Sequence, residues 1–74
     1  MSDSASTTIQ VTVNGTVGRF TSGLSVGAWL AEAGRDPRTV AIELNGDILP
    51  RDRYSSTVFV DGDRLEVVQF VQGG

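Results

Sequence analysis

The first half of the chain opens with a strict alternation of apolar and polar residues, which predicts a β-hairpin. Residues 9–13 alternate in the way expected of a strand with one buried face. Asn14 and Gly15 follow, and both residue types accept the positive φ angles of a type I′ turn, so a return strand is expected at Thr16–Thr21. Gly18 in the return strand has no side chain, and we expect a helix to pack closely over it.

The next segment has the apolar spacing of a short helix over residues 25–33. Ser25 is a favourable N-cap, and Leu24 and Trp29 have the spacing of a hydrophobic staple around it. Gly34 supplies a C-terminal stop. We assign Trp29 to the core rather than to ligand stacking, because it shares one apolar helix face with Val26, Leu30 and Ala33.

Three further extended segments complete the pattern. They are Val40–Leu44, Asp47–Leu49 and residues 64–70, and a second Asn-Gly pair, at 45–46, turns the first into the second. This order predicts an α+β fold with a mixed sheet of about five strands and one main helix across one face. With the first and last strands parallel and adjacent at the centre, the topology is the β-grasp, or ubiquitin-like, fold.

The two ends of the chain differ from its body. Residues 1–8 are polar and predict a disordered leader, residues 9–72 form the β-grasp domain, and residues 73–74 form a flexible Gly-Gly tail. Glycines have no Cβ, so this backbone can thread a narrow channel that a larger side chain would block. The reactive group is then the α-carboxylate of Gly74, and Gly73 serves its access. The alternative is that the pair is only a frayed chain end.

Composition excludes several kinds of chemistry. The chain has no Cys, no His and no Lys, which removes disulfides, imidazole catalysis, the usual zinc ligands and side-chain amines. Its Ser and Thr residues have no His to activate them, so we expect no enzyme activity, no metal and no bound cofactor. A net charge of −3 argues against nucleic-acid binding. No apolar run approaches the roughly 18 residues that span a bilayer, so we expect a cytoplasmic protein.

The predicted sheet face opposite the helix carries apolar residues. Side chains alternate between the two faces of a strand, which places Val68 on this outer face together with Thr12 and Val17. Phe70 lies beyond them, nearer the tail. We expect a partner protein to dock on this patch. The alternative is a set of ordinary scattered surface hydrophobes.

Two groups of charged residues are candidate sites. Asp61 and Asp63 flank a glycine and offer too few oxygen ligands for a metal, so a tight turn explains them better. Arg51 and Arg53 suit an anion such as phosphate, but solvated side chains or partner contacts are the simpler interpretation.

In order and spacing, these segments resemble the ThiS/MoaD family of ubiquitin-like sulfur carrier proteins. The resemblance runs over residues 9–74 and is carried by Val-Asn-Gly at 13–15, Ser-Val at 25–26, VAIELNG at 40–46, Leu-Pro-Arg at 49–51, Asp-Gly-Asp at 61–63 and Gly-Gly at 73–74. The Leu-Pro-Arg and Asp-Gly-Asp segments look more like the thiamine-pathway branch, ThiS, than the molybdopterin branch, MoaD.

The resemblance implies a carrier that partner enzymes act on. An E1-like activating enzyme of the ThiF/MoeB type would use ATP and magnesium to adenylate the Gly74 carboxylate. A persulfide sulfur donor would displace AMP and leave a thiocarboxylate, whose sulfur would pass to an acceptor such as thiazole synthase. Three alternatives stay open: a carrier for molybdopterin, cysteine or a secondary metabolite; a ubiquitin-like modifier joined to lysines of its targets; and a β-grasp interaction module with an inert tail.

Overall fold

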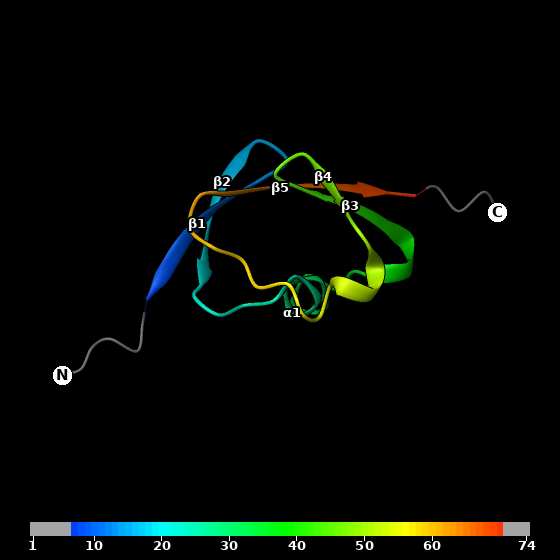
Figure 1. Cartoon of the computed structure of the whole chain (residues 1–74), viewed down its shortest axis with the longest axis horizontal. Coiled ribbons are helices and arrows are strands. Elements are labelled where there is room, and N and C mark those ends of the chain that lie inside the picture. Colours follow the sequence, from blue (N-terminus) through cyan, green and yellow to red (C-terminus); the bar gives the residue numbers. More distant parts are fainter. Residues whose placement is uncertain (1–6, 71–74) are drawn as a thin grey trace.

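A computed structural model describes residues 7–70 of the chain and confirms the predicted β-grasp architecture. The elements are β1 (Thr8–Val13), β2 (Thr16–Thr21), α1 (Val26–Glu32), η2 (Pro37–Thr39), β3 (Val40–Leu44), β4 (Asp47–Leu49), η3 (Arg51–Arg53) and β5 (Asp63–Gln69), where η marks a short 3-10 helix. The strands form one sheet in the order β2-β1-β5-β3-β4, and α1 lies across one face of it (Figure 1). Because β5 runs parallel to β1 and antiparallel to β3, the C-terminal strand is the central one.

The first hairpin has the register that the alternation predicted. Val11 pairs with Gly18, and Val13 pairs with Thr16 across the turn. The turn residues Asn14 and Gly15 have φ angles of 49° and 85°, the positive values that a type I′ turn requires.

The ordered domain begins earlier than the sequence suggested. Thr8, which the sequence placed in the leader, is the first residue of β1 and pairs with Thr21. The carbonyl of Thr7 accepts a hydrogen bond of 3.0 Å from the backbone N–H of Ser22. The sheet thus extends the hairpin ladder by one more pair, and the rest of the predicted leader, residues 1–6, lies outside the described residues.

The prediction that the helix packs closely at Gly18 was wrong. A Cβ at Gly18 would meet the ring of Phe20 at 3.6 Å, within the same strand, and it would meet no atom of α1. The close approach occurs instead at Gly27 of α1. Its N–H donates to the carbonyl of Tyr54 at 2.9 Å, and a Cβ there would lie 3.3 Å from the Cα of Ser55. Gly27 therefore lets α1 dock directly against the corner that follows η3.

Helix α1 begins and ends as the sequence predicted, but its apolar face is shorter. The Ser25 hydroxyl accepts a hydrogen bond of 3.0 Å from the N–H of Ala28, and Gly34 follows the helix with a φ of 72°. Ala33 is the C-cap and is exposed, so the buried face of α1 ends before it. Trp29 packs against the core but is only partly buried. No helix within residues 7–70 is long and apolar enough to cross a membrane.

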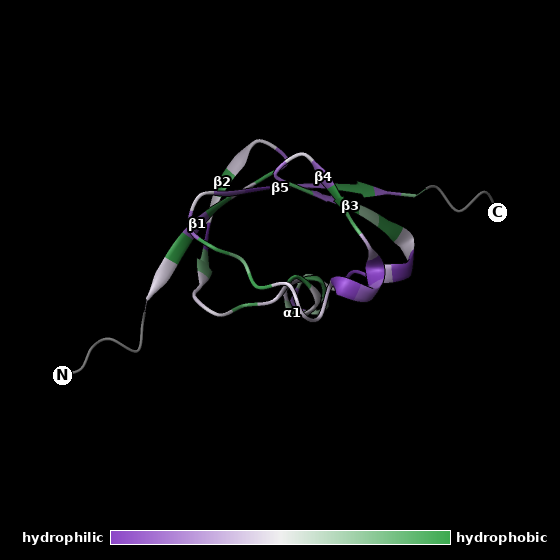
Figure 2. Cartoon of the chain, viewed as in Figure 1, coloured by the Kyte–Doolittle hydropathy of each residue, from purple (hydrophilic) through white to green (hydrophobic). Residues whose placement is uncertain are grey.

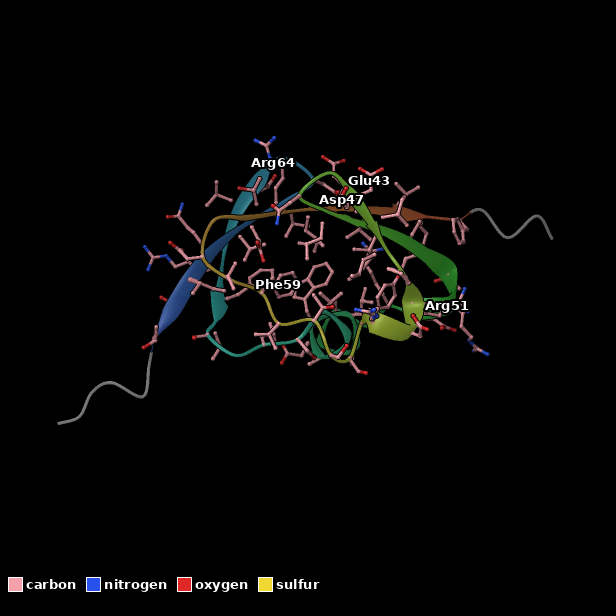
Figure 3. The ribbon with its side chains drawn as sticks, in the orientation of Figure 1. Glu43, Asp47, Arg51, Phe59 and Arg64 are labelled. Carbon is pink, nitrogen blue, oxygen red and sulfur yellow. The ribbon has the colours of Figure 1, made fainter. Side chains whose placement is uncertain are left out.

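The hydrophobic core fills the space between the sheet and α1. Phe59, from the connection before β5, points into this space (Figure 3), and its ring meets the Phe20 ring edge-on at a centroid distance of 4.9 Å. A strongly hydrophilic stretch lies at η3, to the side of this core (Figure 2). The buried hydrophobic residues are Val11, Phe20, Val26, Leu30, Val40, Ile42, Tyr54, Phe59 and Leu65.

Candidate functional site

The end of β5 is tied to the short turn that precedes β3. Gln69, the last residue of β5, accepts a hydrogen bond at Oε1 from Nη1 of Arg35 (2.7 Å) and donates one from Nε2 to Oγ1 of Thr39 (3.0 Å). The backbone N–H of Phe70 donates to the carbonyl of Thr39 at 2.8 Å. These bonds fix the direction in which the chain leaves the sheet as far as Phe70.

The two residues predicted to carry the chemistry, Gly73 and Gly74, lie outside the described residues. Phe70 is the last described residue, and 46% of its surface is exposed. It lies directly beyond β5, so its position nearer the tail agrees with the expectation from the sequence. What the structure defines is the strand and the anchored exit from which residues 71–74 continue.

Two asparagine side chains hold β5 from the turns on either side of it. At the β1–β2 turn, Asn14 accepts the backbone N–H of Val67 at Oδ1 (2.8 Å) and donates from Nδ2 to the Val67 carbonyl (3.3 Å). At the β3–β4 turn, Asn45 accepts the N–H of Arg64 at Oδ1 (2.9 Å) and donates to Oδ1 of Asp63 (3.0 Å). Sequence reasoning recognised both only as turn residues, although the repeated Asn-Gly pair was the available signal.

The carboxylates of Asp61 and Asp63 point to different partners, as expected of turn residues. Oδ1 of Asp61 accepts the N–H of Gln10 at 2.8 Å. Asp63 is only 6% exposed, and its Oδ2 accepts the N–H of Val60 at 2.8 Å. Within residues 7–70 there is no group of three or more His, Cys, Asp or Glu side chains that could hold a metal ion.

In the predicted docking patch Val17, Val68 and Phe70 are exposed and Thr12 is half-buried, but Val68 lies apart from the pair Thr12 and Val17. Thr12 pairs with Val17 on β2 and with Arg64 on β5. Val17 and Val68 are each 58% exposed. Val68 is four residues beyond Arg64 on β5, a displacement of about 13 Å at 3.3 Å per residue, with Glu66 between them. The expectation of one continuous apolar patch was therefore wrong, because the parallel register of β1 and β5 staggers the two valines along the sheet.

Val68 lies opposite Ala41 on this outer face, and the next outward row is acidic. Glu66 of β5 lies directly opposite Glu43 of β3, and Glu43 in turn lies opposite Ile48 of β4, which is 69% exposed. Figure 3 shows Glu43 and Arg64 on the side of the sheet that faces away from α1. The outer face thus combines a pair of carboxylates with two exposed aliphatic side chains.

The arginines near the exit of β5 belong to a different environment. Arg38 forms an ion pair of 2.9 Å with Asp36; the Arg38 side chain is largely accessible to solvent, and the Asp36 side chain is partly accessible. Hydrogen bonds from Arg38 hold the pKa of Asp36 below its usual value, and the positive charge of Arg51 acts weakly in the same direction. Arg51 and Arg53 are exposed on η3, so the interpretation of solvated side chains or partner contacts fits their placement.

Comparison with known proteins places this site in a family context. The family model described as ThiS family matches residues 11–74 of the chain. A protein named thiazole synthase from Paramagnetospirillum magneticum is 39% identical over 66 residues, which cover 89% of this chain and 20% of that protein. The chain therefore spans about a fifth of the length of this curated relative.

Solved structures give a match over the whole fold. The crystal structure of a thiamine biosynthesis protein (ThiS) from Geobacter metallireducens superposes with a TM-score of 0.75 at 32% identity, covering 89% of this chain and 100% of that chain. A solution NMR structure of a thiamine biosynthesis protein from the same organism gives a TM-score of 0.74 at 32% identity, over 89% of this chain and 88% of that chain.

Proposed function

The chain belongs to the ThiS family, and on this premise we propose that it is a sulfur carrier whose Gly74 carboxylate is converted to a thiocarboxylate by partner enzymes. The observation that carries the proposal is the anchored exit of the central strand. Arg35 and Thr39 hold Gln69 and Phe70, and the glycine pair begins three residues after Phe70. A rigid body with a slender end suits a substrate that must reach into another protein's active site.

The chemistry begins at a group that is a poor electrophile. An E1-like activating enzyme, of the ThiF/MoeB type, uses ATP and magnesium to join the Gly74 carboxylate to AMP and releases pyrophosphate. The terminal sulfur of a persulfide donor then attacks the acyl carbon, AMP leaves, and a thiol reductant cleaves the S–S bond to free the thiocarboxylate. The carrier contributes position rather than acid-base or metal chemistry, and the use of ATP places it in the cytoplasm.

The names of its relatives indicate the acceptor. One is called thiazole synthase and another thiamine biosynthesis protein (ThiS). We therefore infer that the sulfur passes to a thiazole synthase during formation of the thiamine thiazole. The test is to incubate the thiocarboxylate form with candidate synthases; transfer to a molybdopterin or cysteine acceptor alone would exclude the thiazole assignment.

The carrier proposal itself is tested at the tail. Deleting Gly74 leaves the carboxylate one residue, roughly 3.5 Å, short of its reach, and an error of 1 Å already costs about a hundredfold in rate. Gly73→Val adds a Cβ and two methyl groups to a backbone that must pass a narrow channel. We expect both variants to lose ATP-pyrophosphate exchange with the activating enzyme, whereas Glu32→Gln, an exposed change on α1, retains it.

Intact mass spectrometry then shows whether sulfur is loaded. After addition of a sulfur donor, the wild-type protein should replace one oxygen by sulfur in its C-terminal peptide. Circular dichroism and melting of the tail variants should match wild type, since neither change touches the core. If the Gly74 deletion is loaded with sulfur as well as wild type, the proposal fails, and isopeptide-linked adducts in cells would instead favour a protein modifier.

A further inference from the structure

The outer face of the sheet over β5, β3 and β4 has no partner within residues 7–70. Its side chains alternate with the buried inward residues Ile42 and Leu65, which places Glu43 and Glu66 on the surface away from α1. Ile48 lies opposite Glu43, and Val68 lies two positions beyond Glu66 on β5. These two side chains are 69% and 58% exposed. This acidic-aliphatic face is defined here by Glu43, Glu66, Ile48 and Val68.

Glu43 and Glu66 lie opposite one another, and neither forms an ion pair within residues 7–70. Directly opposed residues on antiparallel strands have Cβ atoms roughly 5 Å apart, and like charges at that position repel. The ion pair found among residues 7–70 joins Arg38 to Asp36 and involves neither glutamate. Arg64 precedes Glu66 by two positions on the same face but forms no ion pair with it in this part of the chain.

A side chain from outside has room to reach the glutamates. A depression of about 570 Å³ is lined by Glu43, Asn45, Gly46, Gly62, Arg64 and Glu66. The two glycines leave the walls of this depression low. A guanidinium is planar and presents several N–H donors, so it can bridge two carboxylates at this separation, while its neighbours cover the aliphatic side chains.

We propose that the acidic-aliphatic face binds the activating enzyme through an arginine-bearing apolar surface, with the guanidinium held between Glu43 and Glu66. This inference rests on the proposed function and names the surface that the partner must present. Charge complementarity identifies the occupant, because a partner cation relieves a repulsion that the free carrier retains. Glu66 and Val68 lie on β5 itself, so an enzyme seated here is aligned with the strand that leads to the tail.

The test uses the full chain as wild type, Glu43→Gln, Glu66→Gln and the double variant, with Glu32→Gln on α1 as the matched control. The readout is the KM for the carrier in ATP-pyrophosphate exchange with the cognate activating enzyme, measured across ionic strength. Loss of one charge-assisted hydrogen bond corresponds to roughly a tenfold change in affinity. We expect the double variant to raise KM about tenfold or more, with little change in kcat, and to flatten the salt dependence.

The melting temperature of the double variant provides an independent check. Removing the repulsion should leave the double variant as stable as wild type or more stable, so binding weakens while the fold does not. An unchanged KM for the double variant, or an equal increase for Glu32→Gln, would overturn the inference. Absence of exchange by wild type with every activating enzyme would instead refute the proposed function, so the two failures are distinguishable.

Discussion

Replacing Asn14 and Asn45 by glycine, one at a time, measures how strongly each turn holds the central strand. Both residues occupy the first central position of a type I′ turn, with φ angles of 49° and 53°. Glycine accepts these angles, and its cost in the unfolded chain is the same at both positions. The backbone contributions therefore cancel when the two variants are compared, and the side-chain hydrogen bonds decide the difference.

The expected magnitudes follow from what each amide contacts. Asn14 bonds to two uncharged backbone groups of Val67, one of them at a long 3.3 Å, so its loss should cost about 1–2 kcal/mol. Asn45 bonds to the N–H of Arg64 and to the carboxylate of the buried Asp63, and a bond to a charged group contributes about twice as much. Asn45→Gly should therefore cost about 3 kcal/mol.

Denaturant unfolding of the two variants checks the ranking. For a domain of this size, a difference of about 1 kcal/mol separates the melting temperatures by roughly 4–8 °C. Amide hydrogen exchange adds a local readout: Asn14→Gly should accelerate exchange at Val67, and Asn45→Gly should accelerate it at Arg64. Equal stability of the two variants, or a larger loss for Asn14→Gly, would refute the argument that the buried carboxylate depends on Asn45.

Three further predictions concern the core, the pH range and the outer face. Trp29→Ala should lower the free energy of unfolding in urea by about 2 kcal/mol, below the usual 3–5 kcal/mol for a buried aromatic. The reason is that Trp29 is half-buried and stacks on Phe20 with a ring-centroid distance of 5.9 Å. A loss above about 4 kcal/mol would contradict that placement. Burial raises the pKa of the Tyr54 hydroxyl, so its contribution to stability is complete below the usual value near 10 and is lost as pH rises through the raised pKa. Alkaline melting curves should show this loss for wild type and a smaller one for Tyr54→Phe. Val68→Asp should weaken binding of the activating enzyme and leave the melting temperature unchanged, and equal affinity would remove Val68 from the docking face.

Local sequence signals were sufficient for the strands, turns and helix ends. Alternation at 9–13 and Asn-Gly at 14–15 determine a hairpin register that involves only neighbouring residues, and Ser25 and Gly34 mark the helix ends by their own side chain or φ angle. The order of the elements also predicted the β-grasp topology with the first and last strands adjacent and parallel, and the structure has this arrangement.

Contacts between distant segments were not predictable in the same way. The sequence pointed to Gly18 for a close approach, but the approach is made by Gly27 against residues 54–55, which are remote in the chain. The stagger that separates Val17 from Val68 depends on the parallel register of β1 and β5, and a parallel pair has no connecting turn to reveal its register. Site residues that combine two strands were therefore placed on the correct face but in the wrong grouping.

The two faces of the central strand β5 have different roles: its inward residues stabilise the fold, and its outward residues are available to a partner. Its inward residue Leu65 is fully buried, its backbone is held by Asn14 and Asn45, and its end is held through Gln69. The outward side chains of Glu66 and Val68 make none of these contacts, and Glu66 lies opposite the like charge of Glu43. A change on the inner face should therefore lower stability, whereas a change on the outer face should alter partner binding without lowering stability. In a domain of this size, whose margin of stability is small, that separation lets the binding face vary without loss of the fold.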